Sequence, residues 1–78
     1  MQSLHTRDWG VSKLAEAERG VPEINALIER QRQLIEELER DGHDLTSAMI
    51  VFDSLLVSLS LCVQDRHRLR TMLKVKAA

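Results

Sequence analysis

The chain has 78 residues and a net charge of −1, so it holds one domain at most and is not a strongly basic protein devoted to nucleic acid. One Trp, one Phe and no Tyr leave no platform of aromatic side chains on which bases could stack. A single cysteine excludes an intramolecular disulfide and fits a reducing compartment, so we expect a cytoplasmic protein.

Residues 1–11 show no usable periodicity, and we predict a flexible or loosely docked segment there. This segment has no apolar run of signal-peptide length, so we do not expect export. Trp9 stands beside Gly10, and two roles are open for it: it folds back on the chain, or it anchors a partner protein.

An amphipathic helix is predicted over about residues 12–41, because apolar residues recur there at alternating spacings of three and four. Gly20 and Pro22 interrupt it, and proline has no N–H to donate to the preceding turn. The apolar stripe nevertheless stays in phase, so we predict one helix that is kinked near residues 20–22. The alternative is two helices, one capped by Gly20 and one opened by Pro22. The stripe consists of Leu14, Ala17, Val21, Ile24, Ile28, Gln31, Ile35 and Leu38.

A tight turn follows this helix. Gly42 can adopt the left-handed conformation that closes a helix, and Asp44 can cap the next one by accepting its first backbone N–H groups. His43 lies between Asp41 and Asp44, but three ligands this close together do not make a structural zinc site. We therefore assign these residues to the turn and expect no metal and no cofactor.

A second helix is predicted over about residues 45–75, with the same alternating spacing. Its stripe consists of Leu45, Ala48, Phe52, Leu55, Leu59, Cys62, Arg66, Leu69 and Leu73. A short turn makes the two helices antiparallel neighbours, and their stripes then match level by level. We expect an all-α fold, a long antiparallel two-helix hairpin, as a single domain over residues 1–78.

Helix two carries further apolar residues that one partner helix cannot cover. We predict that they form an oligomer interface and that the hairpin dimerises into a four-helix bundle. The residues of this predicted interface are Ile50, Val51, Ser54, Val57 and Leu61. The apolar run 48–63 is shorter than the ~20 residues that a bilayer needs and contains Asp53, so we do not expect it to span a membrane.

Three polar or reactive residues lie on the stripes themselves. Gln31 either fixes register or oligomeric state, or it reaches to the edge of the hairpin. Cys62 is expected to pack as a small hydrophobic residue, because no base is placed to activate it. Arg66 is expected to pair with an acidic residue of the first helix, namely Glu16, Glu18 or Glu23.

The end of helix two is basic. Positive charge at a helix C-terminus and an acidic first helix beside it account for this in ordinary terms. The alternative is a surface for an anion or an acidic partner, with nucleic acid unlikely. The residues concerned are Arg66, Arg68, Arg70 and Lys74, with His67 and Lys76 beside them.

No enzyme is indicated. The sequence shows no pair of acid–base groups, no glycine-rich phosphate loop and no nucleophile with a base. We therefore expect a small protein-interaction or regulatory module that self-associates through helix two, with a larger protein partner as a further possibility. The alternative is a nucleic-acid or anionic-ligand binder that uses residues 66–76.

The block Gln31–Asp44, QRQLIEELERDGHD, is followed by Ala48 and a Leu-rich helix that ends Arg66-His67-Arg68-Leu69. Over about residues 29–73 the chain resembles a family of short uncharacterised bacterial proteins. In that family a Gln-x-x-Leu-Ile-x-x-Leu helix precedes a Gly-His-Asp turn. The resemblance implies a helical hairpin and no particular activity. Gly20-Val21-Pro22 departs from the more regular first helix expected for that family.

Overall fold

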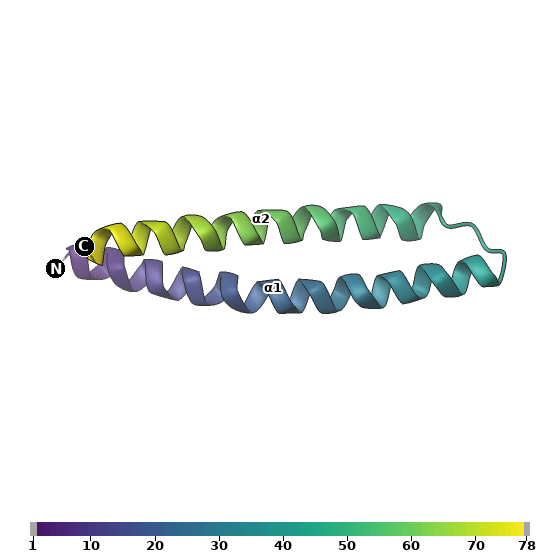
Figure 1. Cartoon of the computed structure of the whole chain (residues 1–78), viewed down its shortest axis with the longest axis horizontal. Coiled ribbons are helices and arrows are strands. Elements are labelled where there is room, and N and C mark those ends of the chain that lie inside the picture. Colours follow the sequence, from purple (N-terminus) through teal and green to yellow (C-terminus); the bar gives the residue numbers. More distant parts are fainter. Residues whose placement is uncertain (1, 78) are drawn as a thin grey trace.

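The computed structural model describes the backbone of residues 2–77 and the side chains of residues 8–74. Two helices account for most of it, α1 (Gln2–Arg40) and α2 (Thr46–Ala77). They run antiparallel, side by side over their whole length, and form a rod of 60 × 18 × 14 Å (Figure 1). The predicted all-α hairpin is confirmed.

The start of α1 differs from the expectation. The helix begins at Gln2, well before the predicted start near residue 12. Gly10 explains the error: it lies one stripe interval before Leu14, is buried, and faces Leu73, whose Cδ2 would be 3.0 Å from a Cβ at Gly10. The apolar stripe therefore continues through a residue that has no side chain to mark it. Met1, the first residue of the predicted flexible segment, lies outside the described residues.

Gly20 and Pro22 do not divide α1. The helix is continuous through both residues (Figure 1), so the alternative of two separate helices was wrong. Val21 and Ile24 are half-buried on either side of the exposed Pro22. Packing against α2 thus holds the chain helical where proline removes one backbone hydrogen bond. The predicted kink stays a prediction.

The end of α1 is closed by a Schellman motif. Gly42 has φ 73°, the one positive φ among the described residues. The N–H of His43 donates to the carbonyl of Leu38 at 2.9 Å, and the N–H of Gly42 donates to the carbonyl of Glu39 at 3.2 Å. These two bonds satisfy carbonyls that the end of a helix otherwise leaves free. The turn chemistry predicted for Gly42 is confirmed.

Asp44 caps the start of α2, as predicted. Its Oδ1 accepts the Thr46 hydroxyl at 2.8 Å and the Thr46 backbone N–H at 3.1 Å. The Thr46 hydroxyl and then the backbone N–H lower the pKa of Asp44 below its usual value, because both donate to the charged form. One oxygen of the carboxylate is therefore engaged in the turn.

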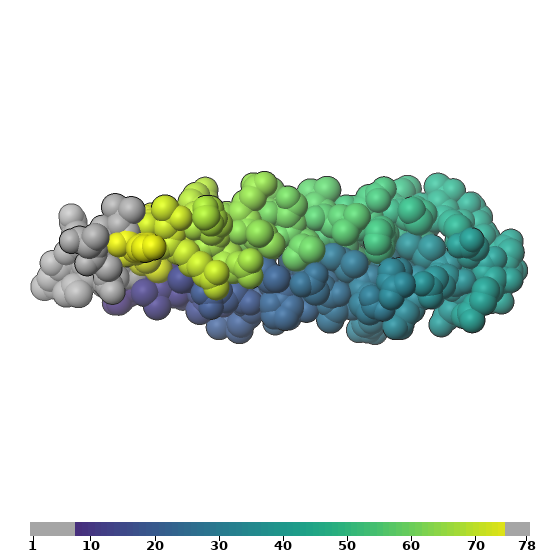
Figure 2. Space-filling view, viewed as in Figure 1, coloured from purple at the N-terminus to yellow at the C-terminus, as the bar shows by residue number. Residues whose placement is uncertain are grey.

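The rod has very little interior. Its most deeply buried hydrophobic residues are Ala17, Ala48 and Leu69, and most other residues of the two stripes are only half-buried. The space-filling view shows the two helices lying along each other (Figure 2). Each helix can therefore cover only one side of the other.

Candidate interaction surface

The outward face of α2 carries a second apolar stripe. Ile50 is 61% exposed, Val57 59% and Leu61 58%. Val51 and Ser54 are exposed as well, so all five residues of the predicted interface are uncovered in the single chain. The hydroxyl of Ser54 donates to the carbonyl of Ile50 at 3.0 Å and is thereby satisfied within its own helix. The surface is apolar, with one small residue near its middle.

The helical repeat explains why α1 cannot cover this stripe. Four of the five residues follow a residue of the buried stripe by two positions, as Ile50 follows Ala48. Val51 instead follows Ala48 by three and lines a groove with Leu27 and Leu34 of α1. Two residues along an α-helix turn the side chain through about 200°. The outward stripe therefore lies almost opposite the face that packs on α1.

Trp9 stands at the edge of an open groove between the two helices. Its side chain is 55% exposed. The groove is lined by Trp9, Lys13, Glu16, Ser58, Leu61 and Arg68, among others. Trp9 does not fold back into a buried position, and it shares this groove with Leu61, the last apolar residue of the outward stripe. Its role as a partner anchor stays a prediction.

The basic end of α2 is partly neutralised. Arg68 Nη2 lies 2.8 Å from Asp65 Oδ1, and Arg70 Nη2 lies 3.4 Å from Glu18 Oε1 on α1. Lys74 is exposed, and the side chain of Lys76 lies outside the described residues. This surface has mixed charge, unlike the continuous positive patch that an anion-binding protein presents.

The ion pair expected for Arg66 is not formed. Arg66 is half-buried and has no acidic partner within ion-pair distance among the described side chains, so that prediction was wrong. Glu18 pairs instead with Arg70, one turn further along α2. The reason is that Arg66 lies on the stripe that faces between the helices, whereas Glu18 is exposed on the flank of α1.

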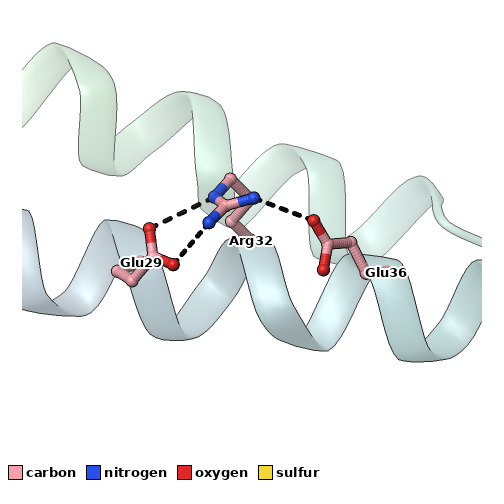
Figure 3. A network of polar contacts seen from close by, with 3 residues as sticks. All are labelled: Glu29, Arg32 and Glu36. Carbon is pink, nitrogen blue, oxygen red and sulfur yellow. Dashed lines mark hydrogen bonds and ion pairs between the residues drawn. The ribbon is translucent and has the colours of Figure 1, made fainter.

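An exposed ion-pair network follows the outer surface of α1. Arg32 donates to both carboxylate oxygens of Glu29 and, through Nη1, to Glu36 Oε1 at 2.8 Å (Figure 3). The hydrogen bonds from Arg32 lower the pKa of Glu29, and the same contacts raise the pKa of Arg32. All three residues belong to one helix at i, i+3 and i, i+4 spacings, which stabilise helices locally. This network therefore supports α1 locally.

Gln31 reaches across to α2. Its Nε2 donates to the carbonyl of Ala48 at 2.9 Å from a partly buried position. Of the roles left open for Gln31, the structure favours fixing the register of the two helices, because the side chain bonds the opposite helix; a role in oligomeric state stays a prediction. The bond joins α1 to the first turns of α2.

Cys62 packs between the helices. Its Sγ donates to the carbonyl of Ala17 at 3.3 Å. Among the described residues no group of three or more His, Cys, Asp or Glu side chains is arranged to hold a metal ion. Cys62 therefore contributes a small side chain and one hydrogen bond to helix pairing.

The composition of α2 has a second consequence. The segment Thr46–Lys74 is long and apolar enough to cross a bilayer by length and composition, with a mean hydropathy of 1.9 in its most apolar window and 6% of that window buried. An exposed helix that pairs with another protein has the same composition, so this test alone does not distinguish the two cases. The expectation that the chain does not span a membrane stays a prediction.

Comparison with models of protein families, with curated proteins and with solved structures finds no match for this chain. The likeness of residues 29–73 to a family of short bacterial proteins therefore stays a prediction.

Proposed function

We propose that this protein is a small interaction module that self-associates through the outward face of α2. The observation that supports it is the exposure of Ile50, Val57 and Leu61 on one side of a helix whose other side is already packed. A contiguous apolar face of this kind on a small chain is typical of an interface. The proposed product is a homodimer.

A second copy of the chain is the occupant that the geometry favours. Two hairpins that meet through α2 form a four-helix bundle, in which each α2 is covered on both sides and each α1 keeps its charged surface in water. Ser54 is small and already hydrogen-bonded, so another helix can approach closely without leaving a polar group unsatisfied. No further component is needed.

Stability argues in the same direction. A two-helix chain of this size without a disulfide rarely exceeds about 3–5 kcal/mol. Complete burial of a fully exposed aliphatic side chain is worth about 1.5–3 kcal/mol, and a little over half of that surface remains to be covered here, before the cost of association is subtracted. Each copy offers Ile50, Val57 and Leu61 for this purpose. Dimerisation is thus a direct way for the hairpin to gain stability.

The alternative, binding of nucleic acid or another anion by residues 66–76, has less support. Arg68 and Arg70 are already paired with Asp65 and Glu18. The alternative predicts salt-dependent binding of an oligonucleotide that is lost when Arg66, Arg68 and Arg70 are all replaced by Glu.

Sedimentation equilibrium over a wide range of protein concentration tests the proposal. We expect a dimer for the natural chain and a helical monomer for Val57→Asp, because the new carboxylate lies in the proposed interface. Ala26→Asp is the matched control: it adds the same charge on the exposed surface of α1 and should remain dimeric. A natural chain that stays a compact monomer would overturn the proposal. In that case, binding to lipid vesicles would identify α2 as a membrane-seeking helix.

A further inference from the structure

We propose that the two copies pair α2 against α2 in an antiparallel register that places Ile50 of one copy opposite Leu61 of the other, and Ser54 opposite Val57. This inference rests on the proposed function and specifies its geometry. It follows from the size, polarity and charge of the residues that α2 leaves exposed.

The outward stripe has the same spacing when it is read backwards. Its members alternate at intervals of three and four, and the midpoint lies between residues 55 and 56. An antiparallel copy centred there puts every member of the stripe opposite another member. The stripe consists of Ser47, Ile50, Ser54, Val57, Leu61 and Gln64; Arg68 follows it at the next interval and lies opposite residue 43 of the other copy. Alternation of three and four is also the spacing at which two helices pack at about 20° in a bundle.

Side-chain size and polarity match in this register. On each side of the centre, Ile50 of one copy packs against Leu61 of the other. Nearer the centre, the small Ser54 of each copy lies opposite the branched Val57 of the other. Polar Ser47 then meets polar Gln64 at the edge of the apolar region. Each large side chain is thus opposed by an apolar or a small one, which is the condition for close helix packing.

The two neighbouring registers are poorer. A shift of one heptad in one direction places Ile50 opposite Arg68, which buries a charged group against an aliphatic one. The same shift in the other direction places Ile50 opposite Ser54 and leaves Leu61 beside the exposed turn at His43. Only the central register covers Ile50, Val57 and Leu61 together.

Charge selects the same arrangement. Arg68 of one copy comes beside the turn of the other, where Asp41 and Asp44 are exposed. The side chain of Arg68 is 76% exposed, and its one ion pair among the described residues is an exposed i, i+3 contact with Asp65. Exposed pairs of this kind are weak, so Arg68 can exchange it for a contact with the turn of the other copy. A parallel dimer would instead bring the two basic ends together and the two acidic turns together. Because the dimer is two-fold symmetric, the contact between Arg68 and the acidic turn occurs twice. Opposite charges therefore favour the antiparallel pairing.

Cysteine cross-linking tests the register. All variants carry Cys62→Ala, so that the introduced cysteine is the sole one, and sedimentation of Cys62→Ala alone checks that the dimer is kept. Ile50→Cys is prepared with ¹⁵N and Leu61→Cys without it, because the two chains are otherwise equal in mass. Each variant is oxidised alone and after mixing and exchange. Mass spectrometry then distinguishes the mixed dimer from the two unmixed ones.

The mixed sample is expected to cross-link, and each variant alone is not. In the proposed register Ile50 faces Leu61, whereas the two copies of Ile50 lie about 16 Å apart along the helices, beyond the reach of a disulfide. Cross-linking of Ile50→Cys alone would show a parallel dimer and overturn the inference while leaving the proposed function intact. A dimer without the mixed cross-link would overturn the register, and a monomer of the natural chain would overturn the proposed function itself.

A charge-reversal series provides a second, independent readout. Arg68→Asp and Asp41→Arg should each weaken dimerisation about threefold to tenfold at low salt, and the two changes in one chain should restore it. Asp41→Arg also replaces an acidic group at the C-terminus of α1 by a basic one, so the fold itself is not penalised. Additive weakening in the double variant would contradict the proposed contact.

Discussion

A Cβ added at Gly20 would lie 2.9 Å from the sulfur of Cys62, so α1 and α2 are in direct contact at these two residues. The thiol also donates to the carbonyl of Ala17 at 3.3 Å. The glycine in the middle of α1 is thus a point of close approach between the helices, although in the sequence it looks like a helix breaker. The structure assigns a packing role to both residues.

Gly20→Ala tests this contact. In an exposed helix interior, replacing Gly by Ala stabilises by about 1 kcal/mol. Here we expect a loss of about 1–2 kcal/mol instead, because the methyl group displaces the Cys62 thiol and breaks its bond to Ala17. Urea unfolding followed by circular dichroism measures the difference.

The matched control for Gly20→Ala is the same change in a Cys62→Ala background. Removing the sulfur removes the clash, so there the substitution should regain its ordinary stabilising effect. The same loss in both backgrounds would show that Gly20 and Cys62 are not coupled.

Gln31 supplies a second prediction. Gln31→Ala should lower the free energy of unfolding by about 1 kcal/mol, since the bond from Nε2 to the Ala48 carbonyl is lost. Gln31→Leu should be neutral or stabilising, because it exchanges that bond for apolar contact between the helices. Thermal unfolding of both variants checks this. Equal losses of unfolding free energy in the two variants would show that apolar contact at position 31 does not compensate for the lost hydrogen bond.

Leu59 and Val57 separate the two faces of α2. Leu59→Asp should unfold the hairpin, with a loss of about 3 kcal/mol or more, because it puts a charge between the helices. Val57→Asp should leave the helical circular dichroism signal largely unchanged, because Val57 is 59% exposed in the single chain. Similar helix content in both variants would contradict the assignment of the two faces.

The cap at Asp44 predicts a pH dependence. Because its folded-state pKa is lowered, the stabilisation is fully present above the ordinary Asp pKa and is lost as the pH falls through the lowered value. The melting temperature should therefore fall below about pH 4, and less so in Asp44→Asn, which keeps a neutral acceptor for the Thr46 N–H. Glu29→Gln serves as a control. It removes another carboxylate whose pKa is lowered, but there the cause is Arg32, which lies far from the turn. An identical pH profile for the natural chain and Asp44→Asn would count against the cap.

Much of the fold follows from spacing and turn chemistry. The alternating spacing of three and four residues predicted both apolar stripes. Gly42 and Asp44 predicted the turn, because both residues act on the local backbone. The start of α1 was missed since Gly10 leaves no apolar side chain in the pattern. The pairing of Arg66 was missed since spacing gives no measure of how far toward the flank a charged side chain lies.

The five interface residues proposed on α2 were selected from the sequence alone, and the structure adds that they are exposed. Four of them, all except Val51, lie two positions after the buried stripe. This spacing was present in the sequence, but it indicates a surface only when the buried side is known. Ser54 illustrates this: its bond to the Ile50 carbonyl, which makes it a small and satisfied surface residue, is visible only in the structure.

By itself the sequence determined that there are two helices, where they turn, and which stripe of each faces the other, because helix period, capping and chain length are local properties. Only the tertiary structure decided that Gly20 joins the helices, that Gln31 bonds Ala48, and that Glu18 pairs with Arg70. These contacts depend on the distance and rotation between two helices. Those two quantities are set by the packing of side chains far apart in the chain, which no local pattern records.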